Sequence, residues 1–455
     1  MQKKYFLFLI FTFQFLFFNF SNAQQNKSLI SGPWAGNVEL RTAVIWAEVN
    51  QTVKKIALNY YPASNKKNIK SVVYKGELGN DFNPIKIEVN GLDVGTKYEY
   101  SLVIDDKTIS LPFNTSFTTK DLWQYRKPAP NFSFLTGSCA YFNQPIYDRP
   151  GKGYGSDSSI FETMAKTPAD FHVWLGDNWY TREVDYSSPW GLNYRASHDR
   201  AEPILQAFMA SMAQYAIWDD HDYGPNDAGK SYIFKKESRD VFKKYWLNPS
   251  YGEDEKGIYS IVSYGDVDLF LLDDRTWRAE SELPDSINNE PNISKTFLGA
   301  QQMDWLQNSL LFSKAIFKII VTGSQVLNPL NKYECMQHYP YEYNQLINFL
   351  SNQKINGVVF LTGDRHHSEV IKMNRENNYP LYDITVSPYT SGVSKVSGIE
   401  LINPNRELNT LVEAQNFGKI SFSGNKGERK MNVSFIGIKG ENLANWIISE
   451  NDLKK

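Results

Sequence analysis

The sequence predicts a chain of two folded parts, a small all-β sandwich followed by a larger α/β domain. Residues 28–119 alternate short β-like segments with turns, residues 120–130 are rich in proline, and residues 131–455 alternate apolar strands with amphipathic helices. The chain has 455 residues, 42% of them hydrophobic, which is enough to bury a large core.

The first 23 residues predict an export signal that is removed from the folded protein. Lys3 and Lys4 form a basic start, residues 5–20 are almost entirely apolar, and residues 21–23 (Ser-Asn-Ala) supply the small side chains that a signal peptidase reads. A retained anchor is the weaker alternative, because the apolar run is short for a bilayer and contains two polar residues. We therefore expect an exported protein that is not integral to the membrane; the periplasm, the outer surface and the extracellular space stay open as destinations.

Residues 28–119 predict the β-sandwich. Thr42–Val49 and Ile85–Val89 alternate apolar and polar residues, and a later segment leads from a glycine turn into a strand with Tyr98 and Tyr100 on one face. Such spacing is typical of a small sandwich and is similar to fibronectin-type domains. We expect this domain to pack against the other or carry a lid, rather than to bind a ligand by itself.

The second domain begins after residues 120–130, where two prolines stiffen the chain and block regular structure. Near-continuous apolar strands predict a sheet that is buried on both faces. These strands are expected at Phe132–Leu135, Phe171–Leu175, Tyr215–Trp218, Leu269–Leu272, Lys318–Val321, Val358–Leu361 and Leu381–Val386. Helices are expected at Ile204–Met212, Gln301–Leu311 and Tyr343–Leu350.

Most of these strands end in residues that can bind metal ions. The polar segments are Thr136–Cys139, Gly176–Tyr180, Asp219–Asp227, Asp273–Arg275 and Gly363–His367. In α/β sheets the carboxyl ends of the strands meet at one crevice, so residues far apart in sequence come together there. One such segment would be weak evidence, but five in order indicate a common site.

The mixture of ligand types indicates phosphate-ester chemistry. Two metal ions can bind the negative oxygens of a phosphate ester, acidify a water and stabilise the leaving oxygen. Carboxylates suit calcium, magnesium or manganese, whereas thiolate, phenolate and imidazole favour a transition metal. The sequence therefore predicts two unlike ions. The formal net charge of −2 gives no global attraction to nucleic acid, so we expect no specific nucleic-acid recognition.

In their order, these motifs resemble those of the PhoD-type alkaline phosphatases and phosphodiesterases, a branch of the calcineurin-like metallophosphoesterases. The resemblance covers about residues 131–390 and is weak outside them. It implies an αββα sandwich, in which helices cover two β-sheets. It also implies Fe³⁺ and Ca²⁺ as the ions, and small-molecule or polymeric phosphate esters as substrates that a metal-activated water hydrolyses.

The resemblance also implies a role for each matching residue. Asp177 would bridge the two metals. Cys139, Tyr180 and His366 would complete the ferric site, and Asp220 and Asp364 would hold the harder, calcium-like ion.

Three further residues would act on the substrate. His221 would lie beside the leaving group as a proton donor or charge stabiliser, Arg275 would bind the phosphate, and Asn226 would bind a metal or a substrate oxygen. The alternative for Arg275 is a purely structural role, in which it pairs with Asp273 or Asp274 and does not contact the substrate.

Two other classes of function stay open. Cys139 could be the nucleophile of a cysteine-dependent hydrolase with His221 or His366 as its base, although the surrounding carboxylates would raise its pKa. The chain could also be a noncatalytic surface-binding protein with a degenerate second domain. A disulfide between Cys139 and Cys335 is the minor alternative to metal binding by Cys139.

Overall fold

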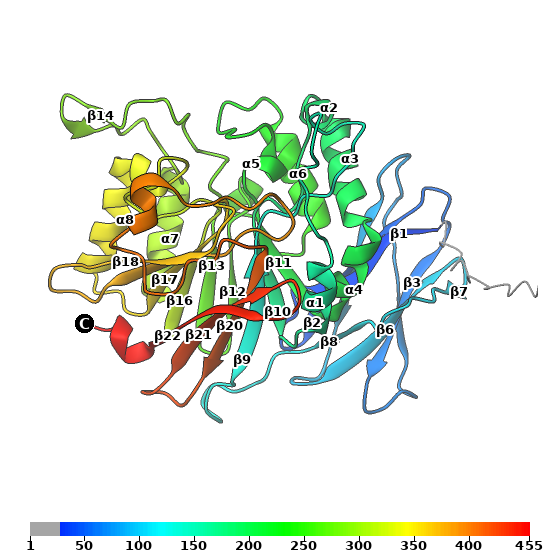
Figure 1. Ribbon diagram of the computed structural model, residues 1–455. Coiled ribbons are helices and arrows are strands. Elements are labelled where there is room, and N and C mark those ends of the chain that lie inside the picture. Colours follow the sequence, from blue (N-terminus) through cyan, green and yellow to red (C-terminus); the bar gives the residue numbers. More distant parts are fainter. Residues whose placement is uncertain (1–27) are drawn as a thin grey trace, which may run out of the picture.

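The structure is a computed structural model that describes residues 28–455 (Figure 1). The expected export signal, residues 1–23, lies outside the described residues. Within the described part of the chain, the helices are too short or too polar to cross a membrane. The chain forms a mixed α/β structure with several sheets, as the sequence predicted.

The N-terminal region consists of two antiparallel sheets. The first has the order β1-β2-β5, with bounds Leu29–Gly36, Thr42–Val49 and Pro84–Asn90. The second contains β3 (Ile56–Pro62), β4 (Lys70–Val73), β6 (Lys97–Ile104), β7 (Lys107–Thr108) and β8 (Ser116–Thr118). Tyr98 and Tyr100 are both buried on one face of β6, which confirms the alternation expected there.

This region packs tightly against the rest of the molecule. The indole Nε1 of Trp46 donates to the carbonyl of Lys244 at 2.9 Å, and the ring of Trp34 lies 5.9 Å from that of Trp246. Glu48 on β2 is also buried here, and its carboxylate accepts hydrogen bonds from Ser197 (2.8 Å) and Tyr245 (3.1 Å). The N-terminal sheets therefore share a core with the helices beside them.

Glu48 should make stability depend on pH. Burial raises its pKa from 4.5 to about 7, against the lowering effect of its two hydrogen bonds. The folded protein thus retains a proton that the unfolded chain loses, so stability falls as pH rises from about 4.5 to 7. We expect Glu48→Gln to change stability little at pH 4.5 and to raise it by about 3 kcal/mol at pH 8, as measured by urea unfolding. The exposed Glu88→Gln is the control, and equal stability of Glu48→Gln and wild type at pH 8 would contradict this prediction.

The first large sheet has six strands in the order β11-β10-β9-β20-β21-β22. Its parallel strands are β9 (Phe132–Gly137), β10 (Phe171–Leu175) and β11 (Ala213–Ile217). The C-terminal strands β20 (Asn416–Ser423), β21 (Lys430–Gly437) and β22 (Asn442–Ser449) extend it, with β20 antiparallel to β9. The sequence analysis did not predict these last three strands.

The second large sheet has the order β12-β13-β16-β17-β19-β18. Its strands are β12 (Ser260–Tyr264), β13 (Val267–Leu271), β16 (Phe317–Val321), β17 (Val358–Thr362), β18 (Glu369–Met373) and β19 (Leu381–Thr385). A two-stranded ribbon, β14 (Ser286–Ile287) and β15 (Glu290–Pro291), projects from the molecule (Figure 1). The seven strands expected in this domain are confirmed, with small changes in their limits.

Helices lie beside both large sheets. Those near the first sheet are α1 (Ile160–Lys166), α2 (Glu183–Tyr186), α3 (Pro189–Arg200), α4 (Pro203–Ser211), α5 (Asp220–Tyr223) and α6 (Lys235–Tyr245). Figure 1 shows α7 (Ala300–Phe312) and α8 (Pro340–Asn352) beside the second sheet. Short 3-10 helices occur at Glu253–Glu255, Met336–His338, Gly398–Ile402 and Glu450–Leu453. The three helices named from the sequence are confirmed, whereas the full αββα arrangement and the domain limits stay predictions.

Two glycines allow close packing at the carboxyl ends of the strands, Gly363 between the two large sheets and Gly176 within the first. A Cβ atom on Gly363, after β17, would lie 2.8 Å from the carbonyl oxygen of Leu175 on β10. A Cβ atom on Gly176, whose φ is +91°, would lie 2.6 Å from Asp219 after β11. Larger residues would push these strand ends apart. The residues that follow both glycines are the expected metal ligands.

Candidate metal centre

The expected ligands arrive from the carboxyl ends of four parallel strands. Cys139 follows β9, Asp177 and Tyr180 follow β10, Asp220 and His221 begin α5 after β11, and Asp364 and His366 follow β17. Three of these strands belong to the first large sheet and one to the second. The centre therefore lies where the two sheets meet.

One group of ligands contains sulfur and nitrogen. Single ligand atoms of Cys139, Asp177 and His366 all lie within 4.8 Å of one another. The hydroxyl of Tyr180 donates to Asp177 Oδ2 at 2.8 Å and lies 3.3 Å from His366 Nε2. His366 Nδ1 lies 2.7 Å from the carbonyl oxygen of Gly392, which can only accept, so Nδ1 carries the proton and Nε2 is free to bind a metal.

A second group shares Asp177 with the first. Ligand atoms of Asp177, Asp220 and His221 also lie within 4.8 Å of one another. The backbone N–H of Asp227 donates a hydrogen bond to Asp220 Oδ2 at 2.8 Å. The Cys139 thiol lies 3.8 Å from the backbone carbonyl oxygen of Asp364, and burial, together with the charge of Asp364, raises the pKa of both Cys139 and Asp177. The structure thus brings together all six residues that the sequence assigned as metal ligands.

Four of these residues have an unusual backbone conformation. Cys139, Asp177, Asp364 and His366 have φ values of +66°, +53°, +65° and +56°. Non-glycine residues rarely occupy this left-handed region, and each such residue costs roughly 1–3 kcal/mol unless its surroundings hold it there. Such a concentration of strained residues is typical of a functional centre.

The electrostatics of the cluster favour a bound cation. Burial, followed by the charges of Cys139 and Asp220, raises the pKa of Asp177 well above its usual range. Burial and the charge of Glu334 raise the pKa of Asp364 to about 7. Within residues 28–455, Asp177 forms no ion pair with a lysine or arginine. Buried carboxylates without a counter-charge are costly, and metal ions of the kinds these ligands prefer would supply it.

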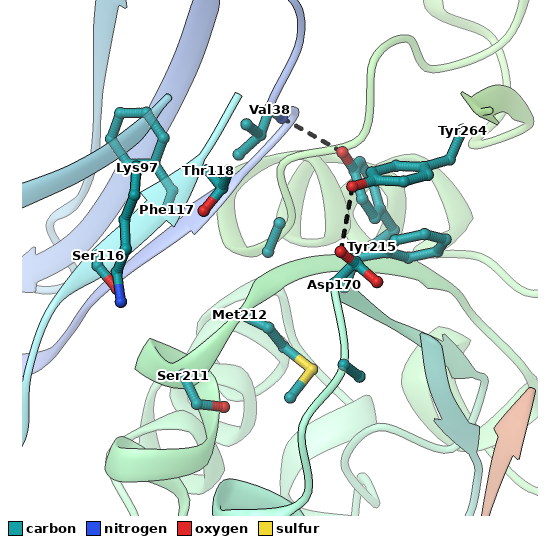
Figure 2. Close-up of a pocket in the computed structure, with 13 residues that line it drawn as sticks. Val38, Lys97, Ser116, Phe117, Thr118, Asp170, Ser211, Met212, Tyr215 and Tyr264 are labelled. Atoms are coloured by element: carbon teal, nitrogen blue, oxygen red, sulfur yellow. Dashed lines mark hydrogen bonds between the residues drawn. The ribbon is translucent and has the colours of Figure 1, made fainter. Parts of the chain in front are cut away.

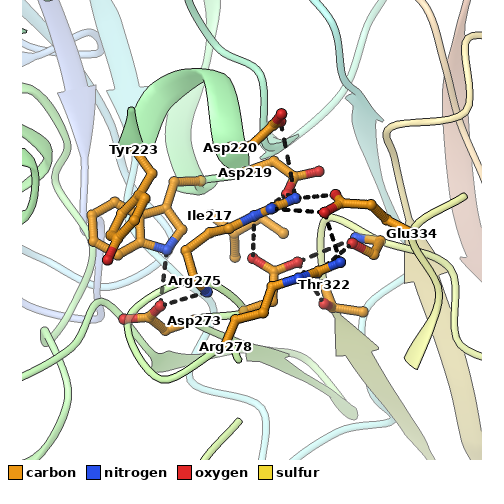
Figure 3. A network of polar contacts seen from close by, with 12 residues as sticks. Ile217, Asp219, Asp220, Tyr223, Asp273, Arg275, Arg278, Thr322 and Glu334 are labelled. Atoms are coloured by element: carbon orange, nitrogen blue, oxygen red, sulfur yellow. Dashed lines mark hydrogen bonds and ion pairs between the residues drawn. The ribbon is translucent and has the colours of Figure 1, made fainter. Parts of the chain in front are cut away.

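Arg275 lies in a buried network of ion pairs with acidic side chains (Figure 3). Its side chain is fully buried, and it donates to Asp219 through Nε at 2.6 Å and to Glu334 through Nη1 at 3.0 Å. Its Nη2 also contacts Asp219 and Glu334. This geometry argues against the expected contact between Arg275 and phosphate. The alternative of pairing with Asp273 or Asp274 holds in part, since Asp274 Oδ1 lies 4.0 Å from Nε and the Arg275 backbone N–H donates to Asp273 Oδ1 at 3.2 Å.

The sequence analysis missed two residues of this network, Glu334 and Arg278. The Glu334 carboxylate joins Arg275 to Arg278, whose Nη2 lies 2.7 Å from Glu334 Oε1 (Figure 3). Ligand atoms of Glu334, Asp219 and Asp220 lie within 4.8 Å of one another, with the Arg275 guanidinium among them as the counter-charge. The network therefore contacts Asp220 and helps to fix its position.

Three other residues singled out from the sequence lie outside the two ligand groups. Asn226 is exposed after α5, and no hydrogen bond between its side chain and the described residues connects it to the cluster. His367 is buried near Glu369 and Glu400 instead of Cys139. Cys139 and Cys335 are both free, so the alternative of a disulfide between them is wrong for this structure.

A cavity of about 210 Å³ lies at the opposite ends of the strands (Figure 2). It is lined by Lys97 and Thr118 from the N-terminal region and by Asp170 and Tyr215 beside the amino ends of β10 and β11. The hydroxyl of Tyr264 donates to Asp170 there at 3.2 Å. The metal ligands follow the carboxyl ends of the same strands, so this cavity is not part of the centre.

Comparison with known proteins agrees with this geometry. The sequence profile of the PhoD-like phosphatases matches residues 134–433, which is more than half of the chain. The chain belongs to the PhoD-like phosphatase family. The resemblance noted in the sequence is thereby confirmed.

Two relatives of this PhoD-like phosphatase show how far the likeness extends. Alkaline phosphatase D of Bacillus subtilis (strain 168) is 23% identical over 330 residues, which cover 62% of this chain and 53% of that protein. The match therefore spans about half the length of this curated relative. A solved structure of PhoD has a TM-score of 0.75 over 94% of this chain and 92% of its own, at 15% identity. At that identity the structural likeness shows the fold alone.

Proposed function

We propose that this PhoD-like phosphatase is an exported, metal-dependent hydrolase of phosphate esters. The observation that carries the proposal is that Asp177 belongs to two ligand groups at once, one with Cys139 and His366 and one with Asp220 and His221. A carboxylate has two oxygens and can bridge two metal ions, and paired ions are a common solution for phosphate-ester hydrolysis.

The two groups differ in chemistry, which supports two unlike cations. Cys139, Tyr180 and His366 would hold the softer ion, for which the family resemblance suggests Fe³⁺. Asp220 and Asp364 would hold the harder one, for which it suggests Ca²⁺. Asp177 would serve both. When bound, the ions would draw the phosphoryl oxygens into place and acidify a water.

His221 is the residue we assign to proton transfer. The Tyr180 ring stacks on its imidazole at 4.1 Å between centroids, and the His221 side chain is 22% exposed, so it can meet a substrate. Burial lowers its pKa and favours the neutral ring, whose N–H can donate a hydrogen bond to the leaving oxygen and stabilise its charge. We place Asn226, which is exposed beyond it, in contact with the substrate.

We propose that the chain has the domain arrangement expected from the sequence. Residues 1–23 would be a cleaved export signal, and residues 28–119 a β-sandwich. Residues 120–130 would link it to an αββα catalytic domain that spans residues 131–455.

A cysteine-dependent hydrolase fits the geometry less well. Cys139 is fully buried, and burial raises the pKa of its thiol to about 12 although hydrogen bonds from Ser138 and Ser387 oppose the shift. A thiol of that kind is protonated at neutral pH and a poor nucleophile, whereas a metal ion would deprotonate it as a ligand.

Metal removal tests the proposal. We expect chelation to abolish turnover of an aryl phosphate, and iron together with calcium to restore it more fully than either alone, because the two ligand groups differ. Elemental analysis before and after chelation measures the metals, and steady-state kinetics measure the turnover. Full turnover by protein shown to be free of metal would reject metal-dependent hydrolysis.

A further inference from the structure

Tyr154 reaches the metal centre from a segment that supplies none of the expected ligands. Its hydroxyl lies 3.1 Å from Nδ1 and 3.5 Å from Nε2 of His366. The hydroxyl end therefore faces the cluster, while the residue as a whole is 45% exposed.

The ring of Tyr154 has a defined place at the rim of the centre. It meets Tyr141 edge-on at 5.0 Å between centroids and Tyr180 at 6.1 Å. A Cβ atom on Gly392 would lie 3.5 Å from this ring, so the ring packs against Gly392. The carbonyl oxygen of Gly392 is the group that orients His366. These contacts hold one side of the ring and leave the remainder open to solvent beside the cluster.

The segment that carries Tyr154 is fixed on its C-terminal side. Asn143 Nδ2 donates to the carbonyl of Gly155 at 2.8 Å, and its Oδ1 accepts from the Gly155 N–H at 2.9 Å. The Ser156 N–H donates to the carbonyl of Thr390 at 2.5 Å. The position of Tyr154 over His366 is therefore built by contacts to two other segments and does not depend on the ring alone.

We infer that Tyr154 is a positioning and specificity residue of this centre. Its hydroxyl holds the His366 imidazole in the orientation in which Nε2 faces the cluster, and its open ring face forms a wall for the alcohol part of the ester. A flat aromatic group would stack on that wall, so aryl phosphates would bind better than glycerol phosphate. This inference rests on the proposed phosphoesterase function for its substrate part only.

Two variants separate the two roles. Tyr154→Phe removes the hydroxyl and keeps the ring, and we expect it to weaken Co²⁺ binding to the metal-free protein about tenfold in calorimetric titration, as loss of a group that orients a ligand does. Tyr154→Ala also removes the wall, and we expect its KM for an aryl phosphate to rise about tenfold relative to its KM for glycerol phosphate. Tyr147→Phe, exposed on the preceding turn, is the matched control and should change neither value.

Each result decides one part of the inference. Wild-type Co²⁺ affinity in Tyr154→Phe would overturn the positioning role. An unchanged ratio of the two KM values in Tyr154→Ala would overturn the specificity role. A wild-type protein that hydrolyses neither ester would instead reject the proposed function, and the Co²⁺ titration would still report on Tyr154.

Discussion

Replacing Asp177 by Asn should remove both metal and activity. The Asp177 carboxylate is the one group common to both sets of ligand atoms, and an amide offers one neutral oxygen in place of two charged ones. We expect turnover of an aryl phosphate to fall about 10³-fold, equivalent to about 4 kcal/mol of lost transition-state stabilisation. Elemental analysis should show the loss of at least one ion for each chain.

A matched change on the surface provides the control for this prediction. Asp304 is exposed on α7, and Asp304→Asn should retain full metal content and turnover. The fold should survive in both variants, because the pKa of Asp177 is raised by burial and by nearby charges, and the substitution removes that unfavourable charge. Normal metal content in Asp177→Asn would contradict a bridging role and revive the noncatalytic alternative.

Replacing Arg275 by Leu should destabilise the protein strongly. The guanidinium is fully buried and is shared by the carboxylates of Asp219 and Glu334 (Figure 3). Its removal leaves two buried acids with less counter-charge, and breaking a buried pair in this way costs about 3–5 kcal/mol. Urea unfolding should show this loss, and Arg275→Lys should recover only part of it because a lysine lacks the planar fork.

The same experiment distinguishes the observed role of Arg275 from the role expected from sequence. An arginine that grips phosphate would lose activity on substitution and leave stability nearly unchanged. Arg126→Leu, at an exposed position, is the control and should alter the free energy of unfolding by less than about 0.5 kcal/mol. Unchanged stability of Arg275→Leu would restore the phosphate-binding interpretation.

Much of the fold could be predicted because buried parallel strands are apolar along their whole length. β10, β16 and β17 are buried at every position and stand out in the sequence for that reason. β21 and β22 instead alternate buried and more exposed residues, and they follow a segment without strong periodicity. They join the sheet through β20, whose pairing with β9 is a long-range contact that local patterns do not reveal.

The expected ligands could be found because each follows such a strand. Glu334 and Tyr154 could not, since both lie in irregular segments whose position depends on distant contacts. The one local sign in the sequence is the set of glycines around Tyr154, which indicates an irregular segment. The sequence identified Arg275 as a residue of the site but did not reveal its ion-pair partners. Asp219 is 56 positions away and Glu334 is 59, so neither could be recognised as a partner from the sequence.

The antiparallel pairing of β20 with β9 has a consequence for biosynthesis. β9 leads directly to Cys139, yet one of its two neighbours in the sheet, β20, begins only at Asn416. A ribosome-bound polypeptide that lacks these C-terminal strands has an open sheet edge at β9. Assembly of the centre therefore depends on strands that are synthesised last.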